Sequence, residues 1–439
     1  MDKHKNPTVT LSVNNDTVFL PVIVSFIEKT ALAMGLSESG AMSLTLAGEE
    51  IFSYLCRMAS PDDKVTINCT RGGWYVKVEF SFFIKDFDLQ AFNLTSTVCI
   101  EDDKSLEDMG LLIASRFVDR FRYSEEKDEG IRLTLIKEKD YPVIGIEGPA
   151  LPPFLSEYSI RRADPEELKT FALLASSFYR EQVIPQFFNY PGKLVDMIAS
   201  GEYQCVLAVD RKGHVGGGIV WGWAGIKTVE CYGPYIFNQG EGSPIAERLL
   251  DACLGAIAKT PALGLLNRLS TPDLPQTYFE KLGELRISDK EGSSTDLPAW
   301  FRQMQEDPGS TVWAHKDLEG WLRGEYQRLV FPREIRTVTE AGETRAPFSV
   351  LSVIFDRQEG MATLQPVRYG SDAEETLANY LRLFEKEALG NIFFEMDLMD
   401  AWQACFTPAL LNLGFRPRMV LPYAGAGDQV IFQRSSGLP

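Results

Sequence analysis

The sequence predicts a mixed α/β (α+β) protein, because segments with strand character alternate with segments with helical character along most of its 439 residues. Residues 228–237, for example, are rich in β-branched and aromatic side chains and predict a strand. Residues 245–254 follow after a glycine-bearing turn, and their apolar side chains recur with a helical period. The same alternation returns in residues 297–434. Strands that alternate with helices are typical of sheets covered by helices.

The composition is that of an ordinary soluble globular protein, with 45% hydrophobic and 24% charged residues. A formal net charge of −17 argues against nucleic acid or an anionic membrane as a partner. The chain shows neither an apolar run of membrane-spanning length nor the apolar core of a signal peptide, so we expect a cytoplasmic protein. Its 7 cysteines lie far apart and it has only 3 histidines, which predicts reduced thiols and no metal site.

Residues 8–139 predict a first domain. The periodicity predicts a strand at 9–13, helices at 18–34 and 39–58, a hairpin of strands at 65–70 and 74–83, a helix at 108–123 and a strand at 130–137. This order of elements resembles the GHKL ATPase domain of anti-sigma-factor serine kinases. The resemblance implies an α/β sandwich that regulates the rest of the chain or docks a regulatory protein partner.

The ATP-binding motifs of that family are degenerate here. In the family pattern Glu-x-x-x-Asn, Glu50 keeps the acid, but Tyr54 stands where the metal-binding asparagine belongs. Phe82 replaces the aspartate that reads adenine, and Gly110 is the one glycine left of a Gly-x-Gly-Leu box. Magnesium needs hard oxygen ligands and a phosphate loop needs glycines, so we expect no useful ATP binding. Glu50 is compatible with a catalytic base, but an exposed acid on a helix is the commoner case.

Residues 140–157 contain several prolines and glycines and predict a linker. Residues 158–289 predict a second domain with a strand and helix near its start, a hairpin that turns at 210–213, the strand-turn-helix at 228–254, a strand at 263–269 and a helix at 277–283. This order resembles the GNAT superfamily of N-acyltransferases. The resemblance implies coenzyme-A-dependent transfer of an acyl group, from acetyl-CoA, to the amine of a small molecule or protein.

The resemblance places the pyrophosphate of coenzyme A on the turn before the helix that starts near Pro244. Backbone N–H groups at a helix N-terminus suit a phosphate. The family pattern Gln/Arg-x-x-Gly-x-Gly/Ala matches Gln239 and Gly242. The expected cofactor-binding residues are Phe237, Asn238, Gln239, Gly240, Gly242 and Ser243. Such a turn is also compatible with an ordinary connection between a strand and a helix.

Two residues are candidates for catalysis. Glu230 lies on the strand where the family often carries its base, although a solvent-facing acid on a sheet edge explains it equally well. Tyr278 is one residue away from Phe279, which takes the position of the family's acid tyrosine; on a helix that offset is a rotation of about 100°. If neither acts, the alternative is a non-catalytic regulatory or binding protein related to anti-sigma factors.

Residues 297–434 repeat the element order of the second domain and predict another, diverged GNAT-like unit. The expected elements are helices at 297–305, 317–329, 372–388 and 402–414, and strands at 335–339, 348–356, 361–367, 391–398, 418–423 and 429–433. A duplication requires the strand at 391 to lie beside the strand at 361. Asp372, Glu374 and Glu375 crowd the start of one helix and compete with an anionic donor, so we expect coenzyme A only in the first GNAT-like unit.

Overall fold

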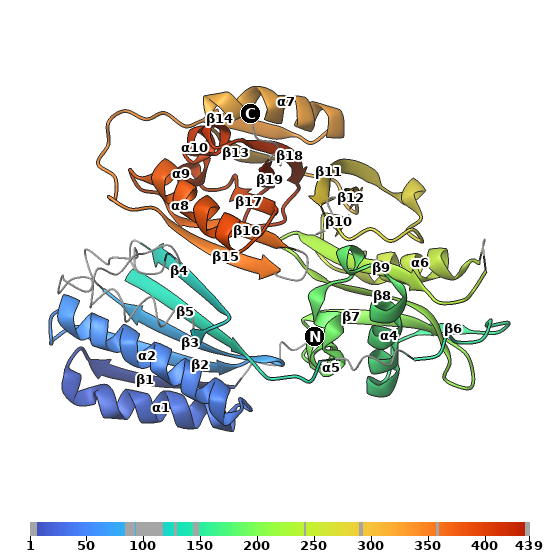
Figure 1. Cartoon of the computed structure of the whole chain (residues 1–439), viewed down its shortest axis with the longest axis horizontal. Coiled ribbons are helices and arrows are strands. Elements are labelled where there is room, and N and C mark those ends of the chain that lie inside the picture. The colour runs from blue at the N-terminus through green and yellow to red at the C-terminus, as the bar shows by residue number, and fades with distance from the viewer. Residues whose placement is uncertain are drawn as a thin grey trace. The chain divides into compact units, whose positions relative to one another are not determined.

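The computed structural model describes residues 7–83, 93, 117–126, 130–143, 149–240, 243–288, 293–356 and 360–434. The chain forms two compact units. The first contains residues up to 140 with the short pieces 346–352 and 370–372, and the second contains the remainder. The mixed sheets and helices of both units confirm the predicted α/β (α+β) fold class (Figure 1).

The first unit is one antiparallel sheet with two helices on one face (Figure 1). Its strands run in the order β1-β2-β3-β5-β4, with β1 (Thr8–Asn14), β2 (Lys64–Arg71), β3 (Tyr75–Phe82), β4 (Arg120–Glu126) and β5 (Gly130–Glu138). The helices are α1 (Leu20–Ala33) and α2 (Glu38–Met58), and Ser37 caps α2 by accepting from Gly40 N–H. Alternate residues of β2 and β3 are buried because they face these helices.

Most of the predicted helix at 108–123 lies outside the described residues, and the prediction is wrong for its end, which is strand β4. The sheet pairs β4 with β5 over its whole length, and such pairing overrides local periodicity. The two-layer arrangement of the unit agrees with the predicted sandwich. Its relation to GHKL ATPases stays a prediction.

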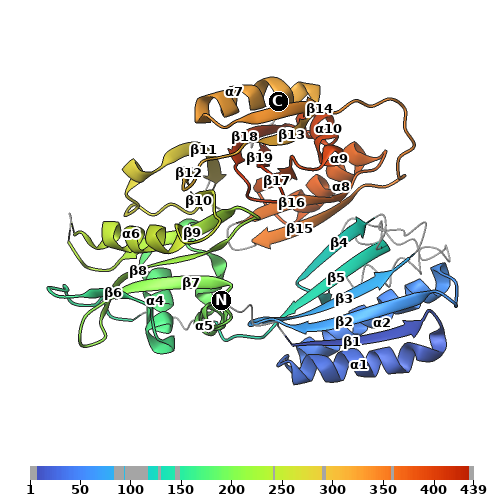
Figure 2. The same cartoon turned by 180° about the vertical axis from the view of Figure 1, so that it is seen from behind.

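The second unit contains a sheet whose strands run in the order β11-β12-β10-β9-β8-β7-β6. They are β6 (Ser159–Arg161), β7 (Tyr203–Val209), β8 (Val215–Trp223), β9 (Thr228–Ile236), β10 (Gly264–Asn267), β11 (Glu280–Ser288) and β12 (Ser294–Gln303). Helices α4 (Pro165–Phe178) and α5 (Pro191–Ala199) pack on one face, and α6 (Ile245–Ile257) packs on the other (Figures 1 and 2). A capping box of Asp164 and Glu167 fixes the start of α4.

A second sheet has the order β15-β16-β17-β19-β18. It consists of β15 (Val350–Asp356), β16 (Met361–Arg368), β17 (Asn391–Asp397), β18 (Phe415–Leu421) and β19 (Gln429–Arg434), with α8 (Ala373–Lys386) between β16 and β17. β8, β9, β10, β12 and β11 follow one another in the same order, with α6 between β9 and β10. Met361 pairs with Asn391 in parallel register, so the strand pairing that a duplication requires is present.

Between β12 and β15 in the sequence, β13 (Ser310–Ala314) and β14 (Arg333–Thr337) form a separate parallel pair joined by α7 (Lys316–Leu329). The predicted helix at 402–414 is two shorter helices, α9 (Ala401–Ala404) and α10 (Thr407–Asn412). The break precedes Pro408, which lies in the first turn of α10, the position where a helix tolerates proline. Among the described residues, no helix combines the length and apolar character needed to cross a membrane.

Two predicted helices are wrong. Residues 280–288 and 294–303 form β11 and β12, an antiparallel pair, and only the 3-10 turn Gln276–Tyr278 remains of the helix expected at 277–283. Ala299 and Phe301 of β12 are buried at a spacing of two residues, which is the period of a strand. Cross-strand packing therefore decides the structure of both segments.

Candidate functional site

The candidate site lies where β9 leaves β10. These strands pair in parallel only from Gly264↔Thr228 to Leu266↔Glu230, and β9 then continues to Ile236. The turn to α6 follows, so the helix start and Glu230 belong to one continuous strand-turn-helix segment. The roles of a base on this strand and of an anion site at the helix N-terminus stay predictions.

Beyond Glu230, the backbone carbonyl groups of β9 accept hydrogen bonds from the side chains of Asn267 and Thr271. The amide Nδ2 of Asn267 donates to the carbonyl oxygens of Cys231 at 3.2 Å and Gly233 at 2.9 Å. The hydroxyl of Thr271 donates to the carbonyl oxygen of Pro234 at 2.7 Å. Oδ1 of Asn267 is buried and has no hydrogen-bond partner within the described structure, so this side chain is only half satisfied.

Tyr179, the residue after α4, closes the end of the same strand. Its hydroxyl accepts from Ile236 N–H at 2.6 Å and lies 2.5 Å from Oδ2 of Asp273. Burial raises the pKa of Asp273, and burial together with Asp273 raises the pKa of Tyr179. A ligand that pairs with this part of β9 as an extended strand has to displace Asn267, Thr271 or Tyr179.

The side chains of the predicted phosphate turn bind the linker. Gln239 is buried; its Oε1 accepts from Leu155 N–H at 2.9 Å and its Nε2 donates to the carbonyl oxygens of Pro153 at 3.1 Å and Phe237 at 2.8 Å. Asn238 donates to the carbonyl oxygen of Pro152 at 2.8 Å. These amides stabilise the linker, so only backbone groups of Asn238 and Gln239 remain for a phosphate.

The rest of the predicted cradle consists of Phe237, Gly240, Gly242 and Ser243. Phe237 is buried among aromatic rings of the core, and its N–H donates to the carbonyl oxygen of Gly216 at 3.0 Å. Gly240 has a φ of 70°, a conformation that favours glycine. Gly242 lies outside the described residues. Ser243 accepts a long hydrogen bond, 3.4 Å, from Ile245 N–H at the start of α6.

Glu230 is 5% exposed, so its interpretation as a solvent-facing edge acid is wrong. Arg268 donates to both carboxylate oxygens, from Nε at 2.7 Å and from Nη2 at 2.9 Å, and the hydroxyl of Tyr232 lies 3.2 Å from Oε2. The charge of Glu230 raises the pKa of Arg268, and burial beside Glu230 raises the pKa of Tyr232. A bidentate arginine stabilises the ionised carboxylate and fixes its orientation.

Arg268 also connects Glu230 to the second sheet. Its Nη1 lies 3.4 Å from Oε1 of Glu395, a residue of β17, and Gln365 of β16 donates to Oε2 of Glu395 at 2.6 Å. Sequence reasoning selected Glu230 and missed Arg268. Arg268 lies 38 positions after Glu230 and follows a buried strand without any motif of its own, so no sequence signal points to it.

Tyr278 is half-buried at the end of a 3-10 turn and is not on a helix, because the segment after it joins β11. Its carbonyl oxygen accepts from Arg302 at 2.9 Å, and the guanidinium of Arg302 lies 5.5 Å from the centre of its ring. The described contacts do not bring Tyr278 together with Glu230.

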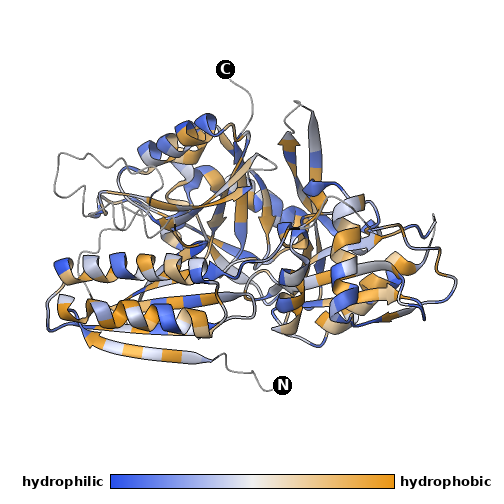
Figure 3. Ribbon diagram, turned by 60° about the horizontal axis from the view of Figure 1, so that its bottom comes forward, coloured by the Kyte–Doolittle hydropathy of each residue, from blue (hydrophilic) through white to orange (hydrophobic). Residues whose placement is uncertain are grey.

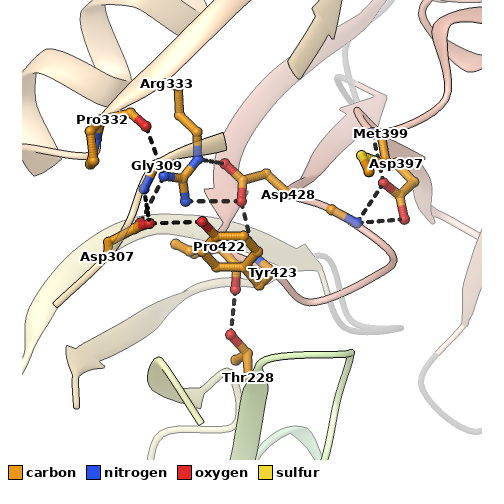
Figure 4. A network of polar contacts seen from close by, with 11 residues as sticks. Thr228, Asp307, Gly309, Pro332, Arg333, Asp397, Met399, Pro422, Tyr423 and Asp428 are labelled. Atoms are coloured by element: carbon orange, nitrogen blue, oxygen red, sulfur yellow. Dashed lines mark hydrogen bonds and ion pairs between the residues drawn. The ribbon is translucent and has the colours of Figure 1, made fainter. Parts of the chain in front are cut away.

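A second buried network joins the two sheets of this unit, and sequence reasoning missed it (Figure 4). Arg333 of β14 has a fully buried side chain and donates to Asp307 at 2.7 Å and to Asp428 at 2.7 Å. The hydroxyl of Tyr423 donates to Asp307 at 2.7 Å, and Thr228 of β9 donates to the carbonyl oxygen of Pro422 at 2.5 Å. Burial opposes the charge of Arg333, but the two aspartates raise its pKa. This network is structural, since it attaches the 422–428 loop to the start of β9.

The second predicted turn, at 370–372, is bonded by residues 346–349. Ser371 N–H donates to the carbonyl oxygen of Ala346 at 2.9 Å, and Gly370 N–H donates to the hydroxyl of Ser349 at 2.8 Å. Asp372 accepts from Ser349 N–H at 2.5 Å. The acid that was expected to compete with an anionic donor thus has a bonding role within this turn.

Comparison with known proteins places these observations beside solved acetyltransferases. No protein-family model matches the chain, and no curated protein matches it. Among solved structures, a GNAT superfamily phosphinothricin acetyltransferase from Sinorhizobium meliloti in complex with AcCoA is 20% identical, covers 33% of this chain and 88% of its own, and has a TM-score of 0.26. A GNAT family N-acetyltransferase from Escherichia coli in complex with CoA is 19% identical, covers 37% and 86%, and has a TM-score of 0.25.

An acetyltransferase of the GNAT family from Staphylococcus aureus Mu50 is 14% identical, covers 34% of this chain and 100% of its own, and has a TM-score of 0.26. The three structures therefore resemble about a third of the chain. At these identities and TM-scores the similarity supports no conclusion about what this chain binds.

Proposed function

We propose that the second unit is a coenzyme-A-dependent N-acyltransferase of the GNAT type, built from two diverged copies of one sheet. The shared strand order of β8–β12 and β15–β19 supports the duplication. The N-terminal unit, residues 8–139, is proposed as a regulatory domain that docks a protein partner and does not bind ATP. The proposed first domain at 8–139 and the linker at 140–157 are kept. The boundary at 289/297 needs correction, because β12 (Ser294–Gln303) pairs with β10 and β11, so the first copy extends from 158 to 303 and the second copy follows it.

The observation that carries this proposal is the position of Glu230. It is a buried carboxylate at the point where β9 leaves β10, and the start of α6 lies at the other end of the same segment. A base and an anion-binding helix start are the two groups that acyl transfer from a coenzyme A thioester needs most. The donor when bound supplies an activated acyl group, and proximity to the amine supplies much of the rate.

The chain's own residues then handle the protons. Glu230 accepts the proton of the attacking amine, which requires Arg268 to give up one of its two hydrogen bonds to the carboxylate. Until that moment the two hydrogen bonds from Arg268 fix the orientation of the carboxylate. Tyr278 remains the proposed acid for the leaving thiolate, from its 3-10 turn. Ser243 and the first backbone N–H groups of α6 are proposed to hold the pyrophosphate.

A second candidate function has an observation in its favour. Asn267, Thr271 and Tyr179 saturate the part of β9 along which an extended donor would bind. In the described conformation this edge does not fit such a ligand. A non-catalytic regulatory protein, in which both sheets serve as binding modules, needs no rearrangement here.

Calorimetry with acetyl-CoA on the full chain separates these candidates. Acetyl-CoA is expected to bind, and Ser243→Asp should weaken it about two- to fivefold, because one like charge at an exposed helix start costs an anion about 0.3–1 kcal/mol. An aspartate before a helix is a good cap, so the variant should stay folded. Ser371→Asp, in the corresponding turn of the second copy, should leave the affinity unchanged.

Ser371 is a better control position than the neighbouring Gly370. A Cβ added at Gly370 would lie 2.2 Å from the carbonyl carbon of Phe348, so a substitution there would disturb the backbone. If millimolar acetyl-CoA gives no binding signal, the acyltransferase proposal fails and the binding protein is left. If only Ser371→Asp weakens binding, the donor belongs to the second copy.

A further inference from the structure

Strand β1 forms one edge of the sheet in the first unit. It pairs with β2 on one side and, among the described residues, with no strand on the other. In Figure 3 the strand that leads from the N-terminus alternates between orange and pale residues. Its 7 residues include no charged side chain and no proline, and its register with β2 has no bulge. Soluble proteins usually protect an exposed edge strand with a charged side chain, a proline or a β-bulge. An edge strand that has none of these therefore indicates a strand-pairing surface.

The sequence of β1 is self-complementary about Leu11. Val9 and Val13 lie two residues on either side of Leu11, and the neighbours of Leu11 are the hydroxyl residues Thr10 and Ser12. Antiparallel pairing of two copies centred on Leu11 therefore places valine opposite valine and hydroxyl opposite hydroxyl. Cross-strand pairs of this kind stabilise a sheet.

The polar face of β1 already forms such a ladder with β2. Thr8 bonds Thr70 at 3.1 Å, Thr10 donates to Asn68 at 2.7 Å, and Ser12 bonds Thr66 at 3.3 Å. A second β1 would continue this ladder on its free side. The pattern of the strand thus matches another copy of itself on both faces.

An apolar groove of about 580 Å³ runs between β1 and α1. Its lining residues are Leu11, Pro21, Val22, Ser25, Phe26, Lys29 and Thr30. Val22 is 48% exposed, and Val9 on the neighbouring strand is 47% exposed. Apolar side chains grouped in this way beside a free strand edge indicate a surface that another protein covers.

The local charge of this surface permits a second copy as the occupant. Two chains that each carry a formal charge of −17 repel one another over most of their surface. The groove lining contains no acid, and its one cation, Lys29, pairs with Glu28 at 3.2 Å. The β1 edge is therefore a surface on which two copies can meet without bringing acids together.

We propose that β1 pairs antiparallel with β1 of a second copy, so that the chain is a homodimer with a two-fold axis at Leu11. Antiparallel pairing of identical strands is an isologous contact, which closes after two subunits. The sheets of the two first units become one continuous sheet, and the exposed valines beside β1 are covered. The proposal does not depend on the function of the second unit.

Sedimentation velocity of the full chain between about 1 and 100 µM tests the proposal. The parent chain is expected to be a dimer that dissociates on dilution. Val9→Lys and Val22→Glu place charges in the interface and should each weaken dimerisation about tenfold or more. Met42→Glu is the matched control, since Met42 is an exposed apolar residue, 64% accessible, on α2 and outside the groove.

Hydrogen exchange of residues 8–14 gives a second readout. Their amides should be protected in the dimer and exchange faster after dilution or in Val22→Glu. A parent chain that is monomeric at 100 µM overturns the proposal, and so does a dimer that Val9→Lys and Val22→Glu affect no more than Met42→Glu. A dimer whose β1 amides exchange at the monomer rate also overturns it, because association then uses another surface.

Discussion

Arg268 binds both carboxylate oxygens of Glu230, at 2.7 and 2.9 Å, and its remaining nitrogen lies 3.4 Å from Glu395 of the neighbouring sheet. One guanidinium thus connects carboxylates from two sheets that share a strand order. The Arg268–Glu230 pair has a structural role, because Arg268 also contacts Glu395 and so links β9 of one sheet to β17 of the other. It also supports the proposed chemistry, because it orients the candidate base.

Arg268→Gln should destabilise the second unit by about 2–3 kcal/mol. Removing one partner of a fully buried pair costs about 3–5 kcal/mol, and Arg268 is partly exposed, which reduces the effect. Chemical denaturation of the full chain measures the change. Arg323→Gln is the control, because its pair with Glu319 is on the surface and should contribute little to stability. Equal effects of the two variants would show that the Glu230 pair is no stronger than a surface pair.

Glu230→Gln should lower kcat about 10²- to 10⁴-fold, with the KM for acetyl-CoA changed less than about twofold, if Glu230 is the base. Glutamine keeps the size of the side chain but cannot accept the proton of an amine. Release of the coenzyme A thiol in the presence of a panel of primary amines measures the rate. Glu284→Gln, an exposed acid paired with Lys281, is the control. Full activity of Glu230→Gln would place the base elsewhere.

Tyr423→Phe should reduce the loss of unfolding free energy that the chain undergoes as the pH becomes alkaline. Burial, with the hydrogen bond to Asp307, raises the pKa of Tyr423 to about 12. An unfolded tyrosine titrates near about 10. Between these two pKa values the folded state keeps a proton that the unfolded state loses. The stability that the protonated hydroxyl contributes is therefore fully present below about pH 10 and is lost as the pH rises to about 12.

The loss amounts to about 2–3 kcal/mol between those pH values, at about 1.36 kcal/mol per unit. The measurement is the unfolding free energy of parent and Tyr423→Phe at several pH values from 8 to 11. The difference between them should shrink as pH rises above 10. Tyr190→Phe, outside this network, should follow the parent. A pH-independent difference for Tyr423→Phe contradicts the buried titration.

Residues 8–139 should not bind ATP with micromolar affinity, in the presence of magnesium, by calorimetry. Tyr54 and Phe82, which replace the metal-binding asparagine and the adenine-reading aspartate, are both buried in the core of the first unit. Their side chains therefore contribute packing instead of ligands. Micromolar binding would show that the unit recognises the nucleotide through residues other than the family motifs.

The elements that the sequence predicts correctly are those whose signal is local. Helices α1, α2, α6 and α8 carry apolar residues at helical spacing, and this spacing alone decides which face is buried. β11 and β12 were predicted as helices because each has residues compatible with a helix. Their strand structure depends on pairing with one another, which the sequence of either segment does not contain.

The candidate site shows the same division. Glu230 is recognisable as an acid on a strand, and the turn after β9 is recognisable by its glycines. The partners that decide what these residues do lie far away in the sequence: Arg268 for Glu230, and Leu155 for Gln239. Contacts of this kind follow from tertiary structure, so sequence patterns alone assigned the amides of Asn238 and Gln239 to a phosphate.

The linker contact has a mechanical consequence. Gln239 shares one amide group between the linker and the carbonyl of Phe237, and Asn238 adds a further bond to Pro152. Residues 152–155 are therefore anchored on the turn that leads into α6. Any displacement of residues 152–155 would therefore break hydrogen bonds to this turn, so the conformation of the turn depends on a segment more than 80 positions earlier in the sequence.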